Sequence, residues 1–176
     1  MTRKNTGRSY EPIDNQTLGR LGVLARADRT RFLASRPDYR GRLVCVALCQ
    51  GAGQHFVDLA RGRKGPNGIK DFDVWSFFAK IPGEKFPAYK RHVHVDFGPS
   101  TFGRWRDERP EFRHFTGRRV DLFLRDLDAS VRADPVQALC RWLDEDRTGS
   151  QRALASKGVV LIDPKRLRGT IVWPEP

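Results

Sequence analysis

The sequence predicts one domain of the α/β or α+β class, with a mixed central sheet flanked by helices. Its 176 residues can bury one sizeable core, and 39% of them are hydrophobic. Apolar stretches typical of strands alternate with amphipathic stretches typical of helices. Residues 1–16 are polar, so we expect a flexible N-terminus there. The sequence contains no internal repeat or low-complexity linker, so we expect a single domain at residues 17–176.

Three stretches have the residue spacing of helices. Residues 17–34 carry apolar side chains on one helical face, with Asn15 or Thr17 as the N-cap. The Asp-Pro pair at residues 134–135 is a typical helix start, because Asp caps the first turn and Pro fits its fixed φ. Residues 150–157 predict a further short helix.

Several segments predict strands. Residues 43–49 are continuously apolar and fit a buried strand or a buried helix, because periodicity does not distinguish the two. Alternating or apolar segments also occur at residues 90–97, 118–125, 159–162 and 170–173. Residues 98–116 are instead rich in turn-forming and basic residues, with aromatic side chains at Trp105, Phe112 and Phe115.

The charge of the chain favours an anionic partner. Lys and Arg number 33 against 21 Asp and Glu, which gives a net charge of +12. Nucleoside triphosphates and nucleic acid are the partners that such a balance suggests. No apolar run approaches the ~20 residues of a membrane span, and no signal peptide is recognisable, so we expect a soluble cytoplasmic protein. The three cysteines are expected to be buried thiols.

Two aspartates lie at the start of an aromatic run. On a strand, Asp71 and Asp73 would point to the same face, because side chains two residues apart do so. Two carboxylates that close repel each other unless a cation lies between them, and Mg2+ prefers oxygen ligands. The alternative interpretation is that both are solvated residues where a strand begins.

A glycine turn and a short helix precede these aspartates. Gly51 and Gly53 permit a tight turn, and residues 54–60 could form a helix whose N-terminal N–H groups would suit a phosphate. The alternative is a plain turn. Further along, Asp121 interrupts the apolar pattern of its strand, and it would otherwise be paired with Arg119 or Arg125.

The order of these motifs resembles the nucleotidyltransferase superfamily related to DNA polymerase beta. The resemblance covers about residues 43–125, with the glycine turn, the Asp-x-Asp pair and a third carboxylate on a later strand. Asp121 matches the third carboxylate better than Asp96 does. Ala52 stands where the family usually has serine, and the stretch from the glycine turn to Asp71 is longer than usual.

The resemblance implies a metal-dependent transfer of a nucleotidyl group from a nucleoside triphosphate to a hydroxyl of an unknown acceptor. It implies that Mg2+, or Mn2+, is held by the catalytic carboxylates Asp71, Asp73 and Asp121. It further implies that phosphate oxygens are held by backbone groups at Gly51 and Gly53, and that charge is neutralised by Lys64, Lys70, Arg118 and Arg119.

Other classes of function remain open at this level. The charge and the aromatic side chains within residues 98–119 also fit a non-catalytic nucleic-acid-binding protein. A metal-dependent nuclease could use the same aspartates. A degenerate nucleotidyltransferase-fold protein could serve as the partner of another protein. Trp75, Phe77 and Phe78 are interpreted as core residues.

Overall fold

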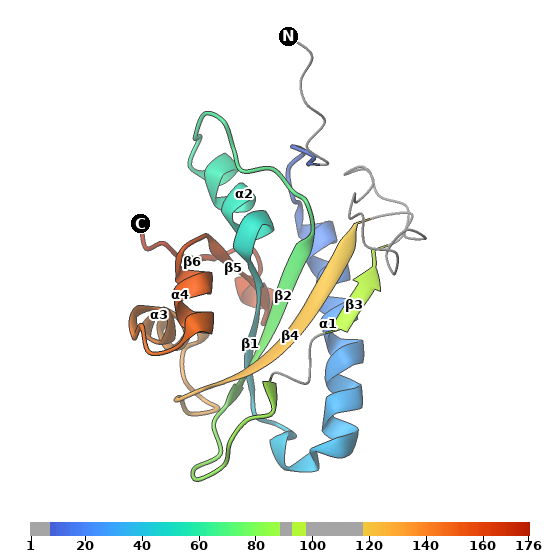
Figure 1. The fold of residues 1–176 in the computed structure, drawn as a ribbon, viewed down its shortest axis with the longest axis vertical. Coiled ribbons are helices and arrows are strands. Elements are labelled where there is room, and N and C mark those ends of the chain that lie inside the picture. Colours follow the sequence, from blue (N-terminus) through green and yellow to red (C-terminus); the bar gives the residue numbers. More distant parts are fainter. Residues whose placement is uncertain (1–7, 89–92, 98–117) are drawn as a thin grey trace.

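One mixed β-sheet organises the chain (Figure 1). The computed structural model describes residues 8–88, 93–97 and 118–176, and these form six strands and four α-helices. The strands are β1 (Leu43–Cys49), β2 (Phe72–Ala79), β3 (Val93–Asp96), β4 (Arg119–Leu127), β5 (Val159–Asp163) and β6 (Ile171–Trp173). Their order across the sheet is β3-β4-β2-β1-β5-β6.

The pairing of the strands is antiparallel except at the centre. β1 runs antiparallel to β2 and to β5, whereas β2 and β4 are parallel neighbours. The two outer strands, β3 and β6, pair antiparallel with β4 and β5. The apolar run of β1 is buried along almost its whole length, which explains why it lacks the alternation of a half-exposed strand.

The helices are α1 (Asn15–Ser35), α2 (Gln50–Ala60), α3 (Pro135–Asp144) and α4 (Gly149–Ala155). Helix α1 begins earlier than the sequence analysis expected, because the side chain of Asp14 accepts a hydrogen bond from the Thr17 backbone N–H. The expected cap of α3 is confirmed, since Asp134 accepts from the Gln137 N–H. A capping box between Thr148 and Gln151 starts α4.

The helices cover opposite faces of the sheet. Helices α1 and α2 pack on one face, where Leu21 and Ala52 belong to the same hydrophobic cluster as Val74 and Leu122. Helices α3 and α4 pack on the other face, against side chains of β1, β5 and β6, and they lie away from α1 in Figure 1. The expectation of one domain with a mixed sheet flanked by helices is therefore confirmed.

Some expected elements fall outside the described residues. The basic segment at residues 98–116, with its aromatic side chains, is among them, as are residues 1–7 and 89–92. Of the expected flexible N-terminus, Ser9 forms an isolated β-bridge with Ile69. No helix in the described part of the chain is both long and apolar enough to cross a membrane.

A contact between two glycines joins α2 to β5. A Cβ atom added to Gly53 would lie 2.2 Å from the Gly158 carbonyl oxygen and 2.9 Å from that of Leu48. A Cβ atom added to Gly158 would lie 2.7 Å from the Gly53 carbonyl oxygen. The N-terminal turn of α2 can therefore approach the start of β5 only when both positions lack a side chain.

We expect Gly53→Ala to lower the free energy of unfolding by about 3 kcal/mol or more, because the new methyl group would meet two backbone oxygens that cannot move independently. The control is Gly149→Ala at the start of α4, where an added Cβ atom has no neighbour within 4 Å. Urea denaturation of both variants measures the difference. Equal stability of the two variants would contradict the close contact.

Candidate functional site

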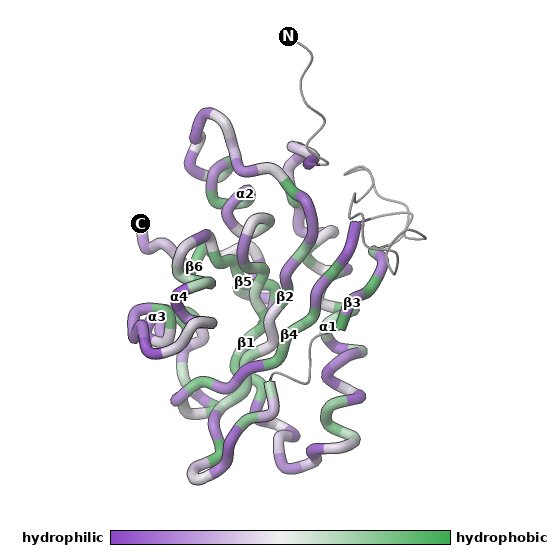
Figure 2. The backbone as a smooth tube through the Cα atoms, in the orientation of Figure 1, coloured by the Kyte–Doolittle hydropathy of each residue, from purple (hydrophilic) through white to green (hydrophobic). Residues whose placement is uncertain are grey.

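Strands β2 and β4 bring two aspartates together. Asp73 and Asp121 are direct register partners on these parallel strands, so their side chains project from the same face of the sheet. Asp71 lies immediately before β2, two residues from Asp73. Figure 2 shows hydrophilic residues where β2 and β4 begin, in contrast to the hydrophobic middle of the sheet. The structure thus places together the three carboxylates singled out in the sequence.

Arg119 connects two of these carboxylates. Its Nη2 donates to Asp71 Oδ2 at 3.0 Å and lies 2.9 Å from Asp121 Oδ2. The Arg119 guanidinium therefore connects Asp71, which lies just before β2, to Asp121 on β4. The ion pair with Arg119 that the sequence analysis considered for Asp121 is present in the structure.

His94 contacts the same aspartate from the outer strand. It is the register partner of Asp121 across β3 and β4, and its Nδ1 is hydrogen-bonded to Asp121 Oδ1. Both oxygens of Asp121 are consequently engaged, one by His94 and one by Arg119. Asp96, the alternative third carboxylate, lies opposite Arg119 on β3 and is not a neighbour of Asp73 in the sheet.

Asp73 is held in an environment that disfavours its charge. Burial, followed by the nearby charges of Asp71 and Asp121, raises the pKa of Asp73 from 3.8 to about 8. Burial also raises the pKa of Asp121, although Arg119 and His94 oppose that shift. The side chain of Asp73 makes no hydrogen bond or ion pair with another described residue. A cation placed beside Asp73 would remove this electrostatic cost.

The three carboxylates supply the type of ligand that a hard divalent cation prefers. Burial first, and then the charges of Asp71 and Asp121, raise the pKa of Asp73, and a bound cation would offset this cost of ionising Asp73. In the described part of the chain, however, no three His, Cys, Asp or Glu side chains are already arranged to hold a metal ion. The donor chemistry therefore fits Mg2+ or Mn2+, while Arg119 occupies oxygens of Asp71 and Asp121.

The N-terminus of α2 adjoins the carboxylates. Cys49, the last residue of β1, is the register partner of Asp73, and α2 begins at the next residue. That residue, Gln50, has a positive φ of 57°, which is uncommon outside glycine and marks the sharp turn from strand to helix. The Asn67 side chain donates to the Gly51 carbonyl oxygen at 3.0 Å and fixes this turn to the loop before β2. Free N–H groups at such a helix start attract anions.

Lys157 is a basic residue near this site that sequence reasoning missed. Its positive charge acts on Asp73 and opposes the rise of that residue's pKa. Lys157 precedes Gly158, whose backbone packs against Gly53 in the first turns of α2. Its place in the sequence, at the end of α4, gives no signal of this proximity. His94 lies in the alternating segment at residues 90–97, but that pattern does not reveal its register with Asp121.

The other basic residues singled out in the sequence lie in different surroundings. Arg118 is buried, and its Nη1 donates to the Lys70 carbonyl oxygen at 2.6 Å, so it connects the starts of β4 and β2. Lys70 is exposed beside Asp71. Lys64 is exposed in the loop after α2 and forms no ion pair within the described residues.

Aromatic side chains continue the same sheet face. Trp75 and Phe123, each two residues beyond an aspartate, are stacked with ring centroids 4.5 Å apart and an interplanar angle of 12°. Phe77 and Phe78 are buried, which confirms them as core residues, whereas Trp75 is only partly buried. The polar site is thus bordered along these two strands by a stacked pair of aromatic rings.

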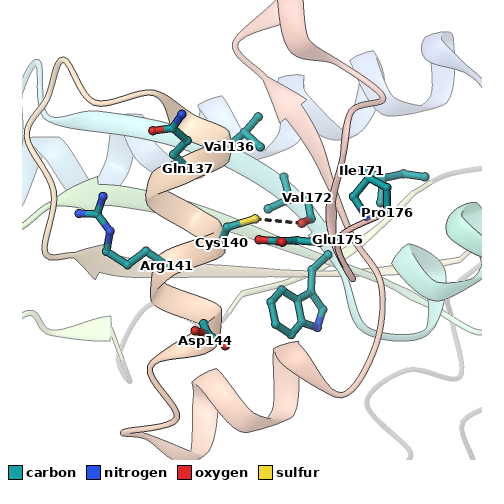
Figure 3. Close-up of a pocket in the computed structure, with 10 residues that line it drawn as sticks. Val136, Gln137, Cys140, Arg141, Asp144, Ile171, Val172, Glu175 and Pro176 are labelled. Atoms are coloured by element: carbon teal, nitrogen blue, oxygen red, sulfur yellow. Dashed lines mark hydrogen bonds between the residues drawn. The ribbon is translucent and has the colours of Figure 1, made fainter.

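A separate cavity of about 670 Å3 lies between α3 and β6 (Figure 3). None of the three carboxylates lines this cavity. Its thiol, Cys140, donates to the Val172 carbonyl oxygen at 3.1 Å, and burial together with Glu175 raises the pKa of Cys140 to about 11. The thiol therefore stays protonated at neutral pH and is a poor nucleophile. The cavity offers no catalytic constellation comparable to that of the carboxylates.

No protein-family model matches the chain, and no significantly similar curated protein or solved structure was found.

We expect Asp73→Asn to stabilise the metal-free protein at pH 8 and to raise its Tm by about 3 °C or more. A raised carboxyl pKa in the folded state contributes stability below the unfolded value, near pH 4, and loses it as pH rises through about 8. The gain in Tm should therefore shrink towards pH 4.

Calorimetric melting in the presence of a chelator, at several pH values, measures this difference. Asp128→Asn is the control, because Asp128 is exposed after the end of β4. A variant Asp73→Asn that is less stable than the wild type at every pH would contradict the electrostatic cost assigned to Asp73.

Proposed function

We propose that the protein is a metal-dependent nucleotidyltransferase that transfers a nucleotidyl group from a nucleoside triphosphate to a hydroxyl group. The observation that carries the proposal is the register pairing of Asp73 with Asp121 on parallel strands, with Asp71 joined to Asp121 by Arg119. The element order supports it as well. Strand β1 leads directly into α2, whose first turn contains Gly51 and Gly53, so these glycines lie in the helix and not in the separate turn that the sequence analysis expected. Both elements precede β2, and the strand with the third carboxylate pairs parallel to β2.

The chain's own groups would divide the work as follows. Asp71, Asp73 and Asp121 would hold Mg2+ or Mn2+, which when bound supplies charge neutralisation at the triphosphate. The first N–H groups of α2 would orient phosphate oxygens, because the helix start adjoins Asp73. Lys157 would add positive charge on the same side. Asp121, kept in place by His94, would accept the proton of the attacking hydroxyl.

Calorimetric titration with ATP, GTP, CTP and UTP, each with and without Mg2+, tests the proposal. We expect one or more nucleotides to bind only with Mg2+, and the double variant Asp71→Ala/Asp73→Ala to lose this binding by at least about 100-fold, because both variants remove oxygen ligands. The matched control is Asp128→Ala, which removes an exposed carboxylate from the end of β4.

Absence of binding for all four nucleotides would overturn the proposal. Nucleic-acid binding that falls steeply with salt and survives Asp71→Ala would favour a non-catalytic, basic nucleic-acid-binding protein instead. Cleavage of a labelled oligonucleotide without added nucleotide would favour a nuclease that uses the same carboxylates.

A second candidate, a degenerate protein of the same fold without activity, is favoured by one observation. Arg119 satisfies oxygens of Asp71 and Asp121 without any metal ion. RNA ends and small alcohols can be offered as acceptors in an assay for pyrophosphate release. Binding of a nucleotide without release of pyrophosphate for any of these acceptors would favour this candidate over an active transferase.

A further inference from the structure

We propose that Arg119 is a built-in cation of the carboxylate site, which a divalent metal ion must displace from Asp71 Oδ2 and Asp121 Oδ2 before it can use those two oxygens. The inference rests on the proposed function, because it concerns the same metal-binding carboxylates. It adds a role for Arg119 that is distinct from neutralising the triphosphate: the residue competes with the metal.

The geometry of Arg119 fits a stand-in for a metal ion. Its Nη2 lies 3.0 Å from Asp71 Oδ2 and 2.9 Å from Asp121 Oδ2, so one nitrogen faces two carboxylates from neighbouring segments. The side chain is only 11% exposed, and that of Asp121 is 5% exposed. Charge-assisted hydrogen bonds in such a poorly solvated place are strong.

The oxygens that remain accessible define where a cation can enter. Asp121 uses Oδ1 for His94 and Oδ2 for Arg119. Asp71 uses Oδ2 for Arg119, whereas the side chain of Asp73 makes no hydrogen bond or ion pair with another described residue. A cation can therefore bind the Asp73 side chain without displacing another described group. It can gain Asp121 Oδ2 and Asp71 Oδ2 only by taking them from Arg119.

Displacement follows from charge and from the anchoring of the residue. A guanidinium and a divalent cation carry charge of the same sign and would occupy the same small volume, so close coexistence is unfavourable. The Arg119 backbone is fixed at the start of β4, but its side chain has several rotatable bonds and can turn away without moving the strand. The released fork would then be available to an anionic ligand beside the metal.

Binding of Mn2+ alone, followed by electron paramagnetic resonance and calorimetry, tests this competition without any nucleotide or turnover. We expect Arg119→Gln to bind Mn2+ at least about tenfold more tightly than the wild type, since two charge-assisted hydrogen bonds no longer oppose the ion. Arg119→Lys keeps the charge but loses the guanidinium fork, and we expect an intermediate gain.

Arg125→Gln is the matched control. Arg125 lies on the same strand and the same face as Arg119, about 20 Å further along at about 3.3 Å per residue, and its loss lowers the net charge equally. We expect its Mn2+ affinity to equal that of the wild type. An equal gain for Arg125→Gln and Arg119→Gln would reduce the effect to overall charge and overturn the inference.

A measurement on the wild-type protein covers the case in which the Arg119 variants do not fold. Phenylglyoxal modifies accessible arginine side chains, and mass spectrometry of the resulting peptides reports each position. We expect Mg2+ to increase the modification of Arg119 several-fold relative to Arg125, because displacement frees the guanidinium. No change at Arg119 under saturating Mg2+ would overturn the inference.

The outcomes separate this inference from the proposed function. Tighter Mn2+ binding by Arg119→Gln without binding of any nucleotide would support the competition and remove the transferase proposal. Mg2+-dependent nucleotide binding by the wild type, combined with unchanged or weaker Mn2+ binding by Arg119→Gln, would do the reverse. Absence of Mn2+ binding in both proteins would overturn both.

Discussion

Burial of Asp73 beside two other carboxylates is the constraint on which the rest of this site depends. The parallel pairing of β2 with β4 makes Asp73 and Asp121 neighbours, and Asp71 follows from its position two residues earlier. Burial removes the water that would otherwise screen them, so the pKa of Asp73 rises to about 8. Arg119 and Lys157 supply positive charge beside the carboxylates, and His94 forms a hydrogen bond with Asp121.

The two faces of the sheet differ in the kind of side chain that they carry. The face under α1 and α2 carries a continuous hydrophobic cluster, and Phe72 and Val74 alternate with Asp73 along the same strand. The opposite face is covered by α3 and α4 near β5 and β6 but presents charged groups at the starts of β2 and β4. A period of two along β2 is therefore sufficient to place an acidic residue at the polar edge of the sheet without a gap in the core.

Local patterns predicted much of this arrangement, and long-range pairing accounts for the rest. The spacing of Asp71 and Asp73, the interruption of an apolar strand by Asp121, and the Asp-Pro start of α3 are visible in short windows of sequence. The bridging role of Arg119 required knowing that β4 lies beside β2, although β3 and residues 98–117 intervene in the chain. Lys157 lies between α4 and β5, and sequence spacing does not reveal that its charge acts on Asp73.

The glycine contact between α2 and β5 also has an evolutionary consequence. Because the backbones at Gly53 and Gly158 touch, neither position can accept a side chain while the other keeps its place. Descendants of this sequence that acquire a larger residue at one position must shift the helix away from β5, and with it the turn beside Asp73. Positions 53 and 158 should accordingly change together or both remain glycine. The pair is therefore a marker for distant relatives in which α2 packs equally closely against β5.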